Sequence, residues 1–157
     1  MTITAERSGR GSRAPTPDDV VVRGALRYGV WTMVTFDETR VLVVDDDPHV
    51  RAAMGRVLRR AGVLVDEAGT GAEAMVMLVR SMFAVVVSDV AMPGMTGVEL
   101  GASMAAHQIE TPLILVTGTD LGEVRRAVGD SQLVRGVFAK PFLAGELISI
   151  VRGLARP

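Results

Sequence analysis

The strongest constraint on the fold of this chain is a repeated alternation between short apolar runs and longer helical stretches. From residue 40 onwards, five runs rich in β-branched residues occur at 41–44, 63–65, 84–87, 113–116 and 137–139. Strands that alternate with helices in this way are typical of an α/β fold, in which helices wrap a parallel sheet. Because the first, third and fourth runs are almost purely hydrophobic, we expect them to be the central strands, buried on both faces.

The stretches between these runs carry apolar residues at spacings of three and four, which place them on one face of a helix. We expect the first helix to end at Gly62, and the second to follow a capping box formed by Thr70 and Glu73. The third should begin near Val98, and the last next to Pro141. The residues expected to face the core are Val50, Met54, Val57, Leu58, Ala61, Met75, Leu78, Val79, Leu100, Met104, Ala105, Leu121, Val124, Val128, Leu143, Leu147, Val151 and Leu154.

A change of composition near residue 40 divides the chain, whose 157 residues suffice for one domain and a short appendage. Residues 1–19 combine serine, glycine and proline with arginine, a composition that buries too little surface to become ordered. Residues 20–39 are more apolar but follow no clean period. We therefore expect an N-terminal extension over 1–39, at least partly disordered, and one domain over 40–157. The segment 20–39 either stays loose or packs on the domain or a partner.

Composition also argues against several classes of function. The absence of cysteine excludes disulfides, thiolate metal sites and cysteine nucleophiles, and two histidines speak against a zinc site. A net charge of −1 offers no basic face for nucleic acid. No apolar run reaches the ~20 residues of a membrane span, and the first residues lack a secretory pattern. We expect a soluble cytoplasmic protein with no nucleic-acid or membrane partner.

Polar residues follow four of the apolar runs, at the point where each expected strand ends. They are Asp45, Asp46 and Asp47, then Asp89, Thr117 and Lys140. Lys140 is the only lysine among seventeen lysine and arginine residues, which suggests a need for a compact ammonium at that position. Because the carboxyl ends of parallel strands meet at one edge of a sheet, we expect these side chains to converge on one pocket.

The expected pocket has the donors of a magnesium site. Carboxylates that are forced together raise one another's pKa unless a cation neutralises them, and a hard cation such as Mg²⁺ prefers oxygen ligands. Asp45, Asp46 and Asp89 meet this requirement. Asp47, in contrast, is followed by Pro48, which is the pattern of a helix N-cap and first helical residue.

Asp89 is open to three chemical roles: metal ligand, base or nucleophile. A carboxylate that attacks phosphorus forms an acyl phosphate, which is an established form of covalent catalysis. In that case Lys140 would supply a positive charge to a phosphoryl oxygen, and Thr117 would supply a hydroxyl donor. Three carboxylates, a hydroxyl and an amine at neighbouring strand ends are improbable as coincidence, and phosphoryl transfer is a chemistry that would give each of them a role.

Residues 40–154 resemble the receiver domain of bacterial two-component response regulators, a domain that accepts a phosphoryl group. The motifs that carry the resemblance are VLVVDDDP, VVVSDVAMPGMTG, LILVTGT and FAKPF, in the family's order and spacing. The resemblance implies a doubly wound, flavodoxin-like fold with a five-stranded parallel sheet. Its strand order would be 2-1-3-4-5, with helices on both faces.

The resemblance also implies a role for each polar residue. Asp89 would be the phosphoacceptor, which takes a phosphoryl group from a histidine of a sensor kinase or a phosphotransfer protein. Thr117 and Lys140 would contact the phosphoryl group, and the Lys140–Pro141 peptide bond is expected to be cis, as cis bonds almost always precede proline.

The same resemblance implies a bound Mg²⁺ ion. Asp45 and Asp46 would bind it together with Asp89 and the main-chain carbonyl of Ala91. Because only a final helix is expected after Lys140, we expect no effector domain. The output would then pass to an unknown downstream protein, with the chain acting as a monomer or weak homodimer.

One position departs from the family pattern. Val137 stands where the family usually places an aromatic residue, three positions before the lysine. The adjacent Phe138 is expected on the opposite face of the sheet, because side chains alternate along a strand. Any signalling change would then rely on Thr117, the loop that follows it and helix packing.

Other interpretations compete with a phosphoacceptor. A receiver-like module that is never phosphorylated would work by docking alone. A Mg²⁺-dependent aspartyl phosphatase of the haloacid dehalogenase type needs DxDx(T/V) at its first strand, which Asp45, Asp47 and His49 match only in part. No glycine-rich turn follows the first run, which argues against a dinucleotide-binding enzyme. We therefore expect a protein that is phosphorylated stoichiometrically and is not a turnover enzyme.

Overall fold

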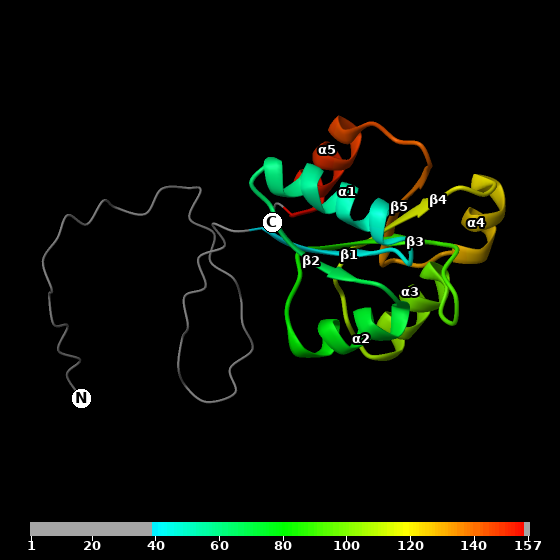
Figure 1. Cartoon of the computed structure of the whole chain (residues 1–157). Helices are drawn as coiled ribbons and strands as arrows, with labels where there is room; N and C mark the ends of the chain where they lie inside the picture. Colours follow the sequence, from blue (N-terminus) through cyan, green and yellow to red (C-terminus); the bar gives the residue numbers. More distant parts are fainter. Residues whose placement is uncertain (1–38, 156–157) are drawn as a thin grey trace, which may run out of the picture. The chain divides into compact units, whose positions relative to one another are not determined.

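The computed structural model describes residues 39–155, which form five strands and five helices in alternation (Figure 1). The strands are β1 (Arg40–Val44), β2 (Leu64–Ala68), β3 (Val85–Asp89), β4 (Leu113–Thr117) and β5 (Val134–Ala139). The helices are α1 (Pro48–Arg60), α2 (Gly71–Arg80), α3 (Gly97–Ala106), α4 (Leu121–Val128) and α5 (Ala144–Ala155). The predicted N-terminal extension lies outside the described residues, apart from its last position.

All five strands pair in parallel, in the order β2-β1-β3-β4-β5. The predicted fold class and strand order are thereby confirmed. The three most hydrophobic runs do occupy the centre of the sheet. Strands β3 and β4 are buried along their whole length, and β1 is buried from its second residue onwards.

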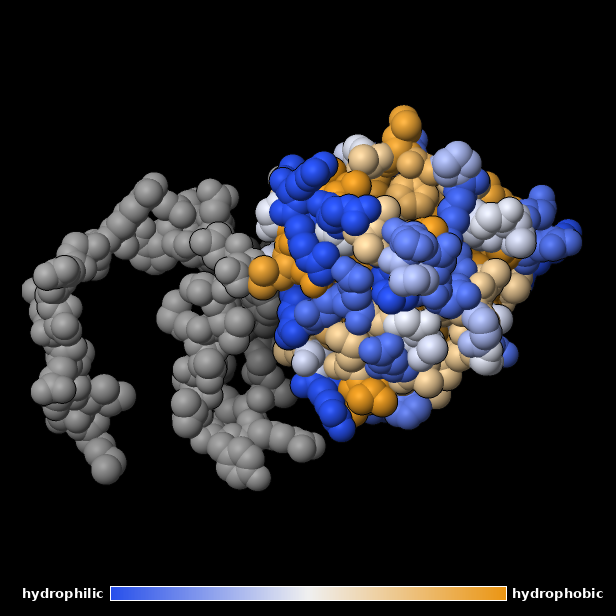
Figure 2. Space-filling view, in the orientation of Figure 1, coloured by the Kyte–Doolittle hydropathy of each residue, from blue (hydrophilic) through white to orange (hydrophobic). Residues whose placement is uncertain are grey.

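Helices cover both faces of the sheet and create two separate apolar layers (Figure 1). On one face, α1 and α5 bury residues such as Leu58 and Val151 against the strands. On the other, α2, α3 and α4 contribute residues such as Leu78, Leu100 and Val124. A fully buried side chain of this size contributes about 1.5–3 kcal/mol, so the two layers supply most of the driving force for folding. Figure 2 shows hydrophobic residues interspersed with hydrophilic ones on one side of the molecule.

The start of α1 follows the predicted pattern. The side chain of Asp47 accepts hydrogen bonds from the backbone N–H groups of His49 (2.8 Å) and Val50 (3.3 Å), and Pro48 is the first helical residue. These bonds satisfy amide groups that have no partner within the helix. They hold the pKa of Asp47 below its usual range. Asp47 is therefore a helix cap, as the sequence indicated.

The end of α1 also follows the prediction. Gly62 has a φ of +82°, its N–H donates to the carbonyl of Arg59, and the N–H of Val63 donates to the carbonyl of Leu58. This pair of bonds is the Schellman arrangement, which needs a residue that adopts positive φ at low cost.

The predicted capping box of α2 is only half formed, and the complete box lies at α3. Thr70 accepts a hydrogen bond from the N–H of Glu73, but the Glu73 carboxylate accepts from the N–H of Gly69 and not from that of Thr70. At α3, Thr96 and Glu99 bond reciprocally through side chain and backbone. Both sequences fit the motif, and the path of the preceding loop decides which one closes.

Three residues predicted to face the core are exposed instead. Val79 is 66% exposed, because the buried stripe of α2 runs through Ala74 and Leu78 and turns away before position 79. Leu143 is 72% exposed and precedes α5, where its carbonyl accepts the first hydrogen bonds of the helix. Ala105 is exposed on α3. Among the described residues, no helix is long and apolar enough to cross a membrane.

Candidate functional site

The predicted polar residues meet at the carboxyl edge of the sheet. Asp89 and Thr117 are the last residues of β3 and β4, whereas Asp45 and Lys140 directly follow β1 and β5. The strand register pairs Thr117 with Ala139, so neighbouring strands end level with each other. This edge is where open α/β sheets place their binding sites.

Three carboxylates form the acidic part of the site. Asp45, Asp46 and Asp89 each offer one oxygen, and these oxygens all lie within 4.8 Å of one another. Asp45 is 1% exposed and Asp89 is 5% exposed, whereas Asp46 is open to solvent. A set of oxygen donors with one solvent-facing member fits Mg²⁺, which keeps several water ligands. The structure thus brings together the three side chains that the sequence predicted as ligands.

Lys140 joins two of these carboxylates. Its Nζ lies 2.8 Å from Asp89 Oδ1 and 3.0 Å from Asp45 Oδ2. Its backbone N–H donates to the carbonyl of Thr117 at 2.7 Å, and the Lys140–Pro141 bond is cis, as expected. The ammonium is therefore held between two buried acids, while the backbone of Lys140 is bonded to the end of a third strand, β4.

The charge of this ammonium is stabilised by its surroundings. Burial lowers the pKa of Lys140, but hydrogen bonds to Asp89 and Asp45 outweigh burial, and the pKa lies above its usual value. A paired cation in a partly buried site keeps its proton because loss of the charge would leave both carboxylates unpaired. Lys140 is thus a permanent positive charge at neutral pH.

Asp45 has a hydrogen-bond partner for each of its polar groups. Its N–H donates to the carbonyl of Ala68 (3.2 Å), and its Oδ1 accepts from the N–H of Asp47 (2.9 Å). Its Oδ2 binds Lys140, and its main-chain carbonyl accepts a bond of 2.6 Å from Nη1 of Arg51. Because all of these groups are hydrogen-bonded, the Asp45 carboxylate has little freedom to move. Its position is therefore set before any ion binds.

Thr117 lies at the site, but its hydroxyl is engaged in its own loop. Thr117 is fully buried, its Oγ1 is 2.7 Å from Thr119 Oγ1, and it accepts from the N–H of Thr119 at 3.0 Å. Within residues 39–155 no hydrogen bond joins Thr117 to Asp89. The predicted contact between Thr117 and a phosphoryl group therefore stays a prediction.

Ala91, the remaining predicted ligand, is exposed and lies two residues after Asp89 in the loop between β3 and α3. Its proposed contribution is a main-chain carbonyl, which any residue type supplies. Its role as a ligand also stays a prediction.

Gly97, the first residue of α3, lies at the site, although its role there could not be predicted from the sequence. A Cβ atom at this position would lie 2.3 Å from the carbonyl oxygen of Asp89 and 3.0 Å from Leu115 Cδ2. The N–H of Gly97 donates to the carbonyl of Val90 at 3.0 Å. The same carbonyl of Asp89 accepts a hydrogen bond from the buried Ser88 hydroxyl at 2.8 Å. The start of α3 thus touches the backbone of Asp89, and only glycine permits this approach.

Comparison with known proteins agrees with this geometry. The family model described as "Response regulator receiver domain" matches residues 41–152. The chain belongs to this family. Among solved structures, this receiver domain superimposes on that of the Francisella response regulator 1452 with a TM-score of 0.70 and 28% identity, over 75% of this chain and 97% of that one. It also matches TrrA from Thermotoga maritima in complex with Mg²⁺-BeF (TM-score 0.66, 28% identity, 74% and 98% of the two chains).

Curated relatives of this receiver domain are larger transcriptional regulators. DctD of Pseudomonas aeruginosa, a C4-dicarboxylate transport transcriptional regulatory protein, is 36% identical over 73% of this chain and 25% of its own length. ResD of Bacillus subtilis, a transcriptional regulatory protein, is 30% identical over 76% of this chain and 49% of its own length. The chain thus spans between a quarter and a half of the length of these relatives.

The receiver domain shows the expected departure at the end of β5. Val137 packs in the apolar layer of α2, α3 and α4, whereas Phe138 packs in the layer of α1 and α5. The two side chains therefore lie on opposite faces of the sheet, as strand alternation predicted.

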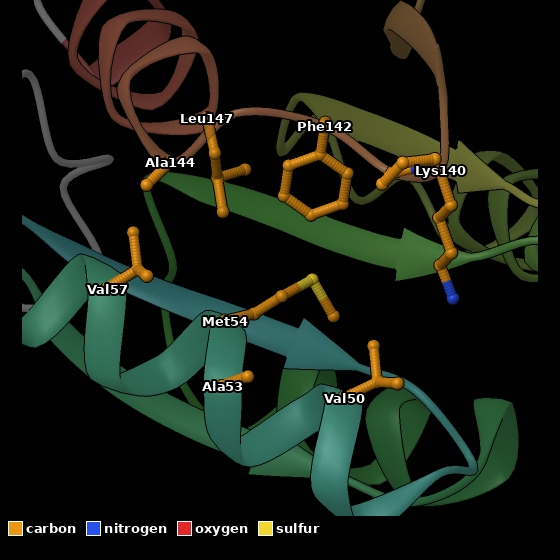
Figure 3. A pocket seen from close by; sticks show the side chains of 9 residues that line it. Val50, Ala53, Met54, Val57, Lys140, Phe142, Ala144 and Leu147 are labelled. Carbon is orange, nitrogen blue, oxygen red and sulfur yellow. The ribbon is translucent and has the colours of Figure 1, made fainter.

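An apolar pocket of about 360 Å³ borders the site between α1 and α5 (Figure 3). Lys140 is the charged member of its lining, and Figure 3 shows the amine pointing away from the apolar side chains. The lining residues are Val50, Ala53, Met54, Val57, Lys140, Pro141, Phe142, Ala144 and Leu147. The aliphatic stem of Lys140 thus has apolar neighbours while its charged end faces the carboxylates, a common arrangement for long cationic side chains.

Proposed function

We propose that this chain is a phosphoacceptor receiver, in which Asp89 accepts a phosphoryl group from a histidine of a sensor histidine kinase or a histidine phosphotransfer protein. The observation that supports this most is the position of Lys140 Nζ, 2.8 Å from Asp89 and 3.0 Å from Asp45. A buried carboxylate beside an ammonium and two further acids has the charges that phosphoryl transfer requires. Membership of the receiver family supports the same assignment.

The transfer forms one bond and breaks one. An oxygen of Asp89 attacks phosphorus, the bond from phosphorus to the donor histidine nitrogen breaks, and its electron pair stays on the imidazole. Lys140 already holds Oδ1 of Asp89, whereas Oδ2 has no hydrogen-bond donor within residues 39–155. We therefore assign Oδ2 as the attacking atom.

The residues of the acidic cluster fit a Mg²⁺ ion by the chemistry of their donors. Asp45, Asp46 and Asp89 would hold it, with the main-chain carbonyl of Ala91 as a further ligand. When bound, the ion neutralises charge on the phosphoryl oxygens. Lys140 remains protonated and orients a second oxygen of the incoming group by a charge-assisted hydrogen bond.

The proposed output is a change of conformation that a partner protein recognises in the cytoplasm. The hydroxyl of Thr117 would leave Thr119 to bind a phosphoryl oxygen, which would alter the loop between β4 and α4. Since Val137 is not aromatic, this loop would be the main route from the site to the surface. The phosphoryl group stays on Asp89 until it is passed on or hydrolysed, so the protein is not a turnover enzyme.

Incubation with acetyl phosphate and Mg²⁺, followed by intact mass spectrometry, tests the assignment. The wild-type chain should gain one phosphoryl group, and Asp89→Asn should gain none. Asp47→Asn is the control, because asparagine is an equally good helix cap and Asp47 lies outside the acidic cluster. It should be phosphorylated like the wild type.

Two results would contradict the proposal. A mass gain that persists in Asp89→Asn would move the acceptor to another residue. If the wild type neither gains mass nor changes its amide NMR shifts with beryllofluoride and Mg²⁺, the chain would be a docking module that keeps only the fold.

A further inference from the structure

Arg51, on α1, reaches the backbone of the acidic cluster with its side chain. Its Nη1 donates to the main-chain carbonyl of Asp45 at 2.6 Å, and its Nε lies 3.6 Å from Oε2 of Glu67 on β2. The Arg51 side chain is 21% exposed. A single guanidinium therefore connects the first helix, the end of the central strand β1 and the edge strand β2.

The carbonyl of Asp45 needs this donor. Asp45 is 1% exposed and belongs to the segment that leaves β1, so its carbonyl is beyond the last hydrogen bonds of the sheet ladder. The adjacent peptide carries Asp46, and the next N–H, that of Asp47, bonds to the Asp45 carboxylate. The orientation of the Asp45 carbonyl thus sets the direction in which both predicted metal ligands leave the strand.

Arg51 is itself held in place by a second ion pair. Oε1 of Glu67 lies 2.9 Å from Nη1 of Arg59, which is about two turns beyond Arg51 on α1. The Glu67 carboxylate lies so close to the helix that a Cβ at Gly55 would be 2.7 Å from its Oε1. The Glu67 carboxylate therefore has a fixed position between two arginines, and it restrains the guanidinium that reaches Asp45.

We propose that Arg51 is a positioning residue for the magnesium site. It orients the backbone of Asp45 so that the carboxylates at positions 45 and 46 converge with that of Asp89 before an ion arrives. This inference rests on the proposed function in one respect, namely that the acidic cluster binds Mg²⁺. Partners that orient metal ligands through a second layer of contacts change metal affinity by on the order of 10–100-fold when they are removed.

The charge of Arg51 acts in the opposite direction. A cation near the cluster repels Mg²⁺, so its removal would strengthen binding if charge were the dominant effect. Arg59 provides a matched control for this effect. Both arginines lie on α1, pair with Glu67 and donate to a main-chain carbonyl, but Arg59 donates to Val65 and does not touch Asp45.

The test is calorimetric titration of the full chain with Mg²⁺ alone, for the wild type, Arg51→Met and Arg59→Met. Each variant loses one positive charge and one partner of Glu67. We expect Arg51→Met to weaken Mg²⁺ binding by about tenfold and Arg59→Met to bind within about twofold of the wild type. Arg51→Lys retains a donor and should bind with intermediate affinity.

Amide NMR spectra and thermal unfolding of each variant establish that the fold is intact. In the ion-free spectra, the amide signals of Asp46 and Asp47 should shift in Arg51→Met and stay in place in Arg59→Met. If Arg51→Met does not fold, Arg51→Lys carries the comparison with Arg59→Met.

Unchanged or tighter Mg²⁺ binding in Arg51→Met would overturn the inference and leave the proposed function standing. Equal weakening in Arg51→Met and Arg59→Met would also overturn it, because the common cause would then be the loss of a partner of Glu67 and not the contact to Asp45. If the wild-type chain itself does not bind Mg²⁺, the metal site of the proposed function fails together with this inference.

Discussion

One ammonium group holds two buried acids at the carboxyl edge of the sheet. Lys140 lies between Asp45 and Asp89, and both carboxylates are more than nine-tenths buried. Because the folded-state pKa of Lys140 is raised, the stability that it contributes is complete below its ordinary value of 10.5 and is lost only as pH rises through the raised pKa. The ion pairs are thus present throughout the physiological range.

Replacement of Lys140 by methionine should therefore destabilise the ion-free protein. Two buried carboxylates would lose their partner, which we expect to lower the unfolding free energy by about 2 kcal/mol. This is less than the roughly 3–5 kcal/mol lost when a fully buried ion pair is broken, because the Lys140 side chain is 26% exposed. Urea unfolding at pH 7 measures the loss, with Arg135→Met on the exposed side of β5 as the control. An unfolding midpoint equal to that of the wild type would show that the pairs do not stabilise the fold.

Gly97 is the second residue on which the site depends. An added Cβ would meet the Asp89 carbonyl at 2.3 Å, so Gly97→Ala should displace either β3 or the start of α3. We expect a loss of about 1–3 kcal/mol in unfolding free energy and slower phosphorylation by acetyl phosphate. Gly145→Ala in α5 is the control, since nothing lies within 4 Å of its added Cβ and it should stabilise the helix by about 0.5–1 kcal/mol. Equal behaviour of the two variants would contradict the close approach.

At the scale of the elements, α3 begins with a capping box that responds to pH. The backbone N–H and hydroxyl of Thr96 hold the pKa of Glu99 below its ordinary value of 4.5. A lowered folded-state pKa means that this stabilisation is present above pH 4.5 and is lost as pH falls through the folded pKa. The contribution acts at the helix whose first residue, Gly97, lies against the backbone of Asp89 at the end of β3.

The stability difference between the wild type and Glu99→Gln should accordingly depend on pH. We expect the wild type to be more stable at pH 7 and the difference to shrink at an acidic pH below the lowered pKa of Glu99, where the carboxylate is protonated. Urea unfolding at the two pH values tests this. An NMR titration of Thr96→Ala should show the pKa of Glu99 moving back towards 4.5. A pH-independent difference would exclude the carboxylate as the source of the effect.

Not every element was equally predictable. The central strands were found from sequence because burial on both faces demands unbroken apolar runs. The edge strand β2 runs on to Ala68, beyond the predicted residue 65, because Asp66 and Glu67 pair with arginines and hide the strand pattern. Likewise β5 begins at Val134, where an irregularity in its pairing with β4 interrupts the alternation.

Within the site, sequence reasoning succeeded for residues whose place follows from strand ends. Asp45, Asp89 and Lys140 were predictable together because parallel strands end at one edge. The contact from Arg51 to the Asp45 carbonyl depends on where α1 lies on the sheet, and no local pattern encodes that position. In the sequence, an arginine that makes such a contact cannot be told apart from one that does not.

For the whole molecule, Mg²⁺ should act as a stabilising ligand. An ion that binds only the folded state raises the unfolding free energy by about 2.7 kcal/mol at a hundredfold excess over its dissociation constant. Thermal unfolding with MgCl₂ or with EDTA measures this increment, which should fall in Asp46→Asn. Asp120→Asn, at the cap of α4 and outside the cluster, should retain it. The same increment in both variants would place the ion elsewhere.

The bridge made by Lys140 means that the acidic pocket carries its own counterion. An entering divalent cation must compete with a charge that is tethered to the chain, and tethering gives such a group a high local concentration. We therefore expect loose and exchangeable loading of the ion instead of permanent capture. The rate at which Asp89 accepts a phosphoryl group would then depend on the free Mg²⁺ concentration of the surrounding solution.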